Sequence, residues 1–165
     1  MVNEQKLLRI YLNDHSGGAF LGIELAKRCL DSNRGTELGD YLEGFIDEVR
    51  SDRDALIDAI EACGFSPDRL KQIGGVIAER AGRLKLNGQL TGYSPLSRLL
   101  ELEGLILGVT GKLMLWRSLK EVVSEHPGVG VVDLDRMIAR AEEQLANLEK
   151  HHHTAARTAL TESGS

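Results

Sequence analysis

The chain is poor in the residues that usually build β-sheets and disulfide frameworks. It contains 165 residues, of which only three are proline, and Phe, Trp and Tyr together make up 4%. Aromatic residues are enriched in strands and proline interrupts helices, so both shortages favour an all-α protein. Two cysteines, Cys29 and Cys63, are too few for a disulfide framework. We therefore expect a reducing compartment, the cytoplasm.

Strong positive charge and long uncharged apolar runs are also missing. The net charge of -5 gives no general attraction for nucleic acid or an anionic membrane. The first residues, MVNEQKLLRIYL, lack the basic and apolar parts of a signal peptide. The longest apolar stretch, 99–116, carries Glu101, Glu103 and Lys112, which is typical of a buried helix rather than a membrane span. We expect neither nucleic-acid nor membrane partners.

The chain also lacks the short motifs that are typical of common enzyme and cofactor-binding classes. No nucleophile elbow, phosphate-binding loop, CxxC pair or Rossmann glycine pattern occurs. The sequence therefore predicts no catalytic residue, and an enzymatic role is less favoured than a non-enzymatic one.

What the chain does contain is four long segments with apolar residues at helical spacing. A turn over 31–35, the Gly64 stop, the Ser94-Pro95 start and the break at 126–128 divide these segments. A shorter segment of the same kind lies between the second and third long ones. The expected helices cover residues 3–30, 37–63, 67–87, 95–125 and 134–160. One domain over 1–160 with a frayed tail, 161–165, is the economical interpretation.

Two layouts fit this order: a five-helix up-and-down array, or a four-helix bundle with an extra helix in its middle connection. Two hairpins of long helices with a long crossover resemble the ferritin-like superfamily. The stretch GRLKLNGQLTGYSPLSRLLELEG, residues 82–104, is also similar to small bacterial proteins of that superfamily. The resemblance covers most of the chain and implies a ferritin-like four-long-helix bundle with a shorter additional helix.

The first hairpin brings two polar residues to one level. Because residues 31–35 form a tight turn, the flanking helices run antiparallel, and the numbering places His15 opposite Asp52. Both residues interrupt apolar stripes, and Glu48 lies one turn from Asp52. We expect His15 and Asp52 to touch, either as a structural pair or as part of a metal site.

The ferritin-like resemblance implies a di-metal centre with carboxylates on each helix and Glu-x-x-His pairs on two of them. This chain departs from that pattern, since Ser51 stands where the histidine is expected and Lys112 falls at the same level. One Glu-x-x-His pair is present near the C-terminus. The metal interpretation, with iron or manganese, uses His15, Glu48, Asp52, Glu149 and His152.

Lys112 has two interpretations: it extends out of the bundle, or it is an internal cation that balances buried carboxylates. Glu103 lies on an apolar stripe beside the main one and is a candidate for the interior. The buried polar cluster predicted without a metal contains His15, Glu48, Asp52, Glu103 and Lys112.

Glycine is abundant, with 18 residues, many of them inside the expected helices. Each costs about 1 kcal/mol relative to alanine there. Glycines recur about one helical turn apart in two places: the pair Gly18 and Gly22, and the series Gly104, Gly108 and Gly111. We expect them to allow close helix approach, and the alternative is a narrow cavity for an apolar ligand.

These patterns leave three functional hypotheses. The first is a structural or interaction module of ferritin-like type without a working di-metal centre and without a cofactor. The second is a metal-binding, oxidase-type protein that uses His15, Glu48 and Asp52. The third is a helical carrier of a small apolar ligand. A homo-oligomer is compatible with all three, and no particular protein partner is indicated.

Overall fold

The computed structural model describes residues 2–67 and 92–161. In these two ranges the chain is all-helical, as predicted, and contains no strand. The helices are α1 (Val2–Ser32), α2 (Glu37–Ala62), α4 (Pro95–Glu121), the short 3₁₀ helix η2 (Pro127–Val131) and α5 (Leu134–Thr161). The four long helices match the expected ones within a few residues at most ends. The short helix expected over 67–87 lies outside the described residues, apart from its first position.

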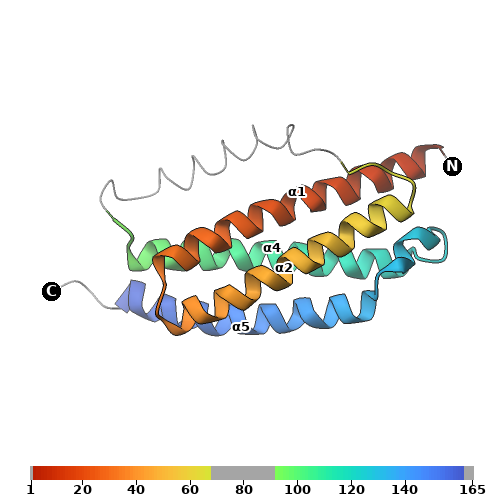
Figure 1. Cartoon of the computed structure of the whole chain (residues 1–165). Helices are drawn as coiled ribbons and strands as arrows, with labels where there is room; N and C mark the ends of the chain where they lie inside the picture. Colours follow the sequence, from red (N-terminus) through yellow and green to blue (C-terminus); the bar gives the residue numbers. More distant parts are fainter. Residues whose placement is uncertain (1, 68–91, 162–165) are drawn as a thin grey trace.

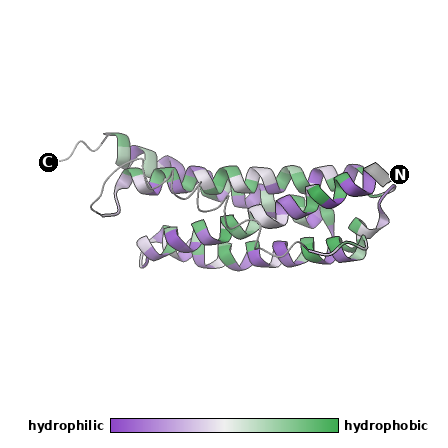
Figure 2. Cartoon of the chain, turned by 90° about the horizontal axis from the view of Figure 1, so that it is seen from above, coloured by the Kyte–Doolittle hydropathy of each residue, from purple (hydrophilic) through white to green (hydrophobic). Residues whose placement is uncertain are grey.

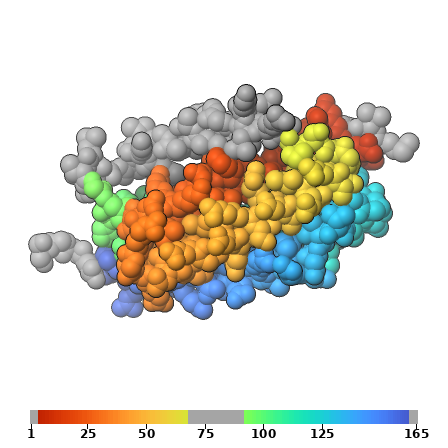
Figure 3. Space-filling model, viewed as in Figure 1, coloured from red at the N-terminus to blue at the C-terminus, as the bar shows by residue number. Residues whose placement is uncertain are grey.

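The long helices lie side by side and alternate in direction in a regular way (Figure 1). Helices α1 and α5 run one way, whereas α2 and α4 run the other way. The ion pair of Arg28 with Glu101 joins the last turns of α1 to the first turns of α4, and that of Lys120 with Asp135 joins the end of α4 to the start of α5. In the space-filling view α2 occupies the near face, between α1 and α5 (Figure 3).

Local signals fix where the helices begin. Thr36 caps α2, because its side chain accepts a hydrogen bond from the backbone N–H of Gly39. Ser94 and Ser97 form a reciprocal capping box at the start of α4, with Pro95 at the first helical position. Gly39 is required by packing, since a Cβ there would lie 2.3 Å from the carbonyl oxygen of Asn33. The α1–α2 turn is therefore tight, as expected from the short segment 31–35.

Hydrophobic and hydrophilic residues alternate in bands along every helix (Figure 2). The apolar bands meet in one core, to which all four long helices and Val129 of η2 contribute. Burying each large side chain contributes about 1.5–3 kcal/mol. The largest fully buried ones include Trp116, Leu12, Leu42, Leu56, Leu102 and Leu148. In the part that the structure describes, no helix has both the length and the apolar content to cross a membrane.

Candidate functional site

Asp52 is the most deeply buried charged residue at the centre of the bundle. It lies on α2, its relative exposure is only 2%, and both carboxylate oxygens are occupied. Oδ2 accepts a hydrogen bond from Nζ of Lys112 on α4 at 2.6 Å, and Oδ1 accepts one from Nη1 of Arg140 on α5, also at 2.6 Å. Asp52 therefore ties three helices together at one level.

The same contacts continue one turn along the bundle. Lys112 also donates to the side-chain oxygen of Gln144 on α5. The amide nitrogen of Gln144 then donates to Oε2 of Glu48 at 2.7 Å. We call this connected set the polar ladder. It consists of Glu48, Asp52, Lys112, Arg140 and Gln144.

The polar ladder is balanced in charge, since two carboxylates face two cations. Burial lowers the pKa of Lys112 from its ordinary value, and the charge and hydrogen bond of Asp52 oppose that shift. A buried charge is tolerated only when it is paired and hydrogen-bonded, and Asp52, Lys112 and Arg140 meet this condition. Glu48 is exposed, so the prediction that it belongs to a buried cluster is wrong. The buried charges of the ladder are thus matched within the chain, and its Glu48 end reaches the surface.

No hydrogen bond or ion pair joins His15 to Asp52 in the described part of the chain, so the predicted polar pair is not formed. Both side chains line the same cavity, so the residue numbering of the antiparallel hairpin correctly placed them at the same height along the bundle. Asp52, however, turns toward the cations of α4 and α5, whereas the ring of His15 packs edge-on against Tyr11 at 4.7 Å between centroids. Burial lowers the pKa of His15 from its ordinary value, against the opposing charge of Asp14. A neutral imidazole competes poorly with two cations for one buried carboxylate.

Glu103 is not part of the buried cluster either. It is exposed, and Nε2 of His152 lies 3.4 Å from its carboxylate. The antiparallel contacts of α4 and α5 pair Lys112 with Gln144 and Glu103 with His152. At 1.5 Å per residue, His152 therefore lies about 12 Å along α5 from Gln144. The Glu-x-x-His pair near the C-terminus is therefore well separated from the level of Lys112.

The five predicted metal ligands consequently do not assemble. Among the described residues, no three His, Cys, Asp or Glu side chains lie close enough to hold one ion. Glu149 is exposed on α5, beyond the end of the polar ladder. At the level of Asp52, two cationic side chains already supply the positive charge. The residues present do not fit a ferritin-type di-metal centre.

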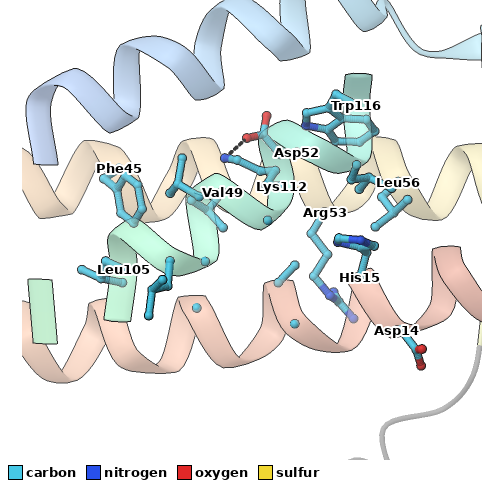
Figure 4. Close-up of a pocket in the computed structure, with 18 residues that line it drawn as sticks. Asp14, His15, Phe45, Val49, Asp52, Arg53, Leu56, Leu105, Lys112 and Trp116 are labelled. Carbon is cyan, nitrogen blue, oxygen red and sulfur yellow. Dashed lines mark hydrogen bonds and ion pairs between the residues drawn. The ribbon is translucent and has the colours of Figure 1, made fainter. Parts of the chain in front are cut away.

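On the other side of Asp52, a cavity of about 290 Å³ lies between α1, α2 and α4 (Figure 4). Most of its wall is apolar, with Leu107, 73% exposed, at its edge. The polar side chains that reach it are Asp14, His15, Asp52, Arg53 and Lys112. The apolar lining consists of Ala19, Phe45, Val49, Leu56, Leu105, Leu107, Val109, Leu115 and Trp116, and four glycines complete the wall.

These four glycines leave space rather than bring helices together. A Cβ added at Gly18, Gly22, Gly108 or Gly111 would meet no atom within 4 Å. The expectation of close helix approach is wrong at these positions. It holds at Gly104, where a Cβ would lie 2.8 Å from Cδ2 of Leu25. The alternative expectation, a narrow cavity, describes the other four.

Two hydrogen-bond donors in the cavity wall lack a protein acceptor in the described structure. They are Nε1 of Trp116, whose residue is only 1% exposed, and Nε of Arg53. Indole and guanidinium N–H groups donate only, so an acceptor would complete both. The lining contains no serine, threonine, tyrosine or cysteine, which leaves no hydroxyl or thiol nucleophile. The arrangement suits reversible binding better than covalent catalysis.

Sequence reasoning missed Arg140, Gln144 and Glu101. Gln144 stands three residues after Ala141 and four before Leu148, so it shares their buried stripe. Glu101 is buried near the start of α4, where Nε of Arg28 donates to it at 2.6 Å and the hydroxyl of Tyr93 at 2.9 Å. No spacing rule reveals Glu101, because Arg28 lies on a distant helix and Tyr93 precedes the start of α4.

Searches against protein-family models, curated proteins and solved structures found no match to this chain. The interpretation of the cavity therefore rests on its own geometry.

Proposed function

We propose that this protein reversibly binds a small, largely apolar ligand in the cavity between α1, α2 and α4. The observation that carries the proposal is the set of four glycines with open space around them. Glycine inside a helix costs about 1 kcal/mol relative to alanine. Alanine would fit at each of the four positions, so packing of the chain does not explain this cost. Open space around a single helical glycine, as at Gly44, indicates no ligand, but these four glycines converge on one cavity, and an occupant that needs the space explains them together.

The size of the cavity agrees with such a role. At about 290 Å³ it lies at the lower end of the range for small-molecule pockets, roughly 300–1,000 Å³. It is about twice the volume of an apolar cavity of roughly 150 Å³ that accepts benzene. A single substituted ring or a short branched chain is therefore the expected size of ligand.

We propose further that the scaffold is a ferritin-like bundle that works without a di-metal centre. Two antiparallel hairpins with α2 parallel to α4 support this scaffold (Figure 1). The polar ladder replaces the metal ligands at the middle of the bundle. The free thiols of Cys29 and Cys63 support a reducing compartment such as the cytoplasm. The protein is then a binding module rather than an oxidase.

The chain carries its own reporter for this proposal, because its single tryptophan, Trp116, lines the cavity. One indole N–H cross-peak is therefore expected in a ¹H–¹⁵N spectrum. Titration with propylbenzene, an uncharged apolar probe, should shift this cross-peak saturably. A dissociation constant follows from the same titration.

Two leucine variants provide the matched test. Gly111→Leu places a side chain in the cavity, whereas Gly44→Leu adds the same side chain to α2 away from the cavity. Saturable shifts in the unmodified protein and in Gly44→Leu, with none in Gly111→Leu, would support the proposal. No saturable shift in the unmodified protein would overturn it, as would equal binding by the Gly111→Leu variant.

A further inference from the structure

Within 2–67 and 92–161, Arg53 is the cation of the cavity that has no carboxylate partner. It follows Asp52 on α2, but its side chain extends toward α1 and ends beside His15 (Figure 4). Its Nε atom is buried without an acceptor, and no ion pair of Arg53 exists among the described residues. A partly buried guanidinium without a partner loses hydration without regaining hydrogen bonds.

The other charged groups of the cavity do not compensate Arg53. Asp52 is already bonded to Lys112 and Arg140. Asp14 is exposed and points away from the guanidinium (Figure 4). His15 carries a lowered pKa as a result of burial, so it adds little positive charge near neutral pH. The positive charge at this end of the cavity therefore comes from Arg53.

We infer that the ligand carries a carboxylate, which Arg53 binds while the apolar body fills the glycine-lined space. This inference rests on the proposed function. A guanidinium can donate two parallel hydrogen bonds to one carboxylate, from Nε and a terminal nitrogen. The apolar wall favours a carboxylate attached to a hydrocarbon body over a free inorganic anion. The donor of Trp116 offers a second contact to any acceptor on the body.

Four probes separate the contributions of charge and apolar body: 3-phenylpropionate, 3-phenylpropylamine, propylbenzene and acetate. Their dissociation constants are measured at neutral pH from the Trp116 indole cross-peak. The carboxylate should bind on the order of tenfold or more tighter than the amine, because a hydrogen bond to a charged group contributes about 1.5–3 kcal/mol. Acetate, without the apolar body, should bind far more weakly than 3-phenylpropionate.

Arg53→Gln and Arg50→Gln form the matched pair of variants. Each removes one positive charge from α2, but Arg50 is exposed and paired with Asp47 outside the cavity. Arg53→Gln should abolish the preference for the carboxylate and leave propylbenzene binding within about twofold. Arg50→Gln should retain the preference.

The outcomes distinguish the two proposals. Propylbenzene binding without a carboxylate preference would overturn the inference and leave the cavity function standing. A preference that survives in Arg53→Gln would overturn the inference as well. Absence of a saturable propylbenzene shift in the unmodified protein would instead overturn the proposed function itself. Equal binding of acetate and 3-phenylpropionate would indicate a site for a simple anion and would also contradict the inference.

Discussion

The two sides of α2 at the middle of the bundle are built in opposite ways. Toward α4 and α5, the polar ladder pairs Asp52 with two cations on neighbouring helices, and the amide of Gln144 donates to Glu48. Toward α1, the same turn of α2 faces a cavity in which Arg53 lacks an acceptor and glycines replace side chains. One side is satisfied within the chain, whereas the other is the side to which we assign ligand binding.

The polar ladder stabilises the arrangement of the helices, whereas the cavity side is the part of the bundle to which we assign binding. A satisfied polar network within a core specifies how the helices align, and its cost is already offset inside the protein. A void and unpartnered donors lower stability, and such features persist mainly where function requires them. Mutations on the ladder side should therefore reduce stability, whereas mutations on the cavity side should increase stability and reduce binding.

The largest effect is expected at Asp52. Asp52→Ala removes the shared partner of Lys112 and Arg140 and leaves two cations partly buried without a carboxylate. The free energy of unfolding should fall by about 3–5 kcal/mol. Urea denaturation followed by circular dichroism measures this change. The control is Asp54→Ala, an exposed position two residues away, which should change stability by less than about 0.5 kcal/mol.

Replacing the whole charged group sharpens this result. The triple variant Asp52→Leu, Lys112→Met, Arg140→Met removes all three partners together. Its unfolding free energy should lie well above that of Asp52→Ala, because no unpaired charge remains. Equal losses in the single and triple variants would show that the ladder is not an interdependent network.

The next largest change in stability is expected when two glycines of α2 are each replaced by alanine. Gly39→Ala should lower stability by about 1–3 kcal/mol, because its Cβ would lie 2.3 Å from the carbonyl oxygen of Asn33. Gly44→Ala, on the same helix with open space, should instead raise stability by about 0.5–1 kcal/mol. Thermal unfolding of both variants measures the contrast. Stabilisation by Gly39→Ala would contradict the tight α1–α2 turn.

A smaller change in stability is expected at two glycines of α4, one of which lines the cavity. Gly108→Ala should raise the unfolding free energy by about 0.5–1 kcal/mol, since its Cβ meets nothing within 4 Å. Gly104→Ala, one turn earlier on α4, should gain less, because Leu25 must move to admit the new methyl group. Calorimetry of the two variants gives the difference. A clear loss of stability in Gly108→Ala would show that the space around it is already filled.

The sequence predicts the helices well because their signals are local. Apolar spacing, the caps at Thr36 and Ser94 and the breaks between segments define all four long helices within a few residues at most ends. Levels along antiparallel hairpins are also predictable, since they follow from helix rise and turn length. His15 and Asp52 accordingly line one cavity.

The direction of a side chain around its helix is harder to predict. Whether Asp52 faces α1 or α4 depends on which helix offers a better partner, and Lys112 and Arg140 both lie far away in sequence. The same limit applies to Gly104 and Gly108, which look alike in sequence although one touches Leu25 and the other faces open space. Such differences arise from the relative placement of helices, which no local pattern encodes.

The smallest expected effect is a pH dependence caused by His15. Burial lowers the pKa of His15 below its ordinary value of 6.5. As the pH falls through that value, the unfolded chain binds a proton that the folded chain resists, so stability should decrease. His15→Gln removes this contribution and should make stability less dependent on pH in that window. Denaturation midpoints at several pH values measure the slope, with His153→Gln, an exposed position, as the control. An unchanged slope in His15→Gln would show that the imidazole is solvated, which would contradict its place in the wall of the cavity.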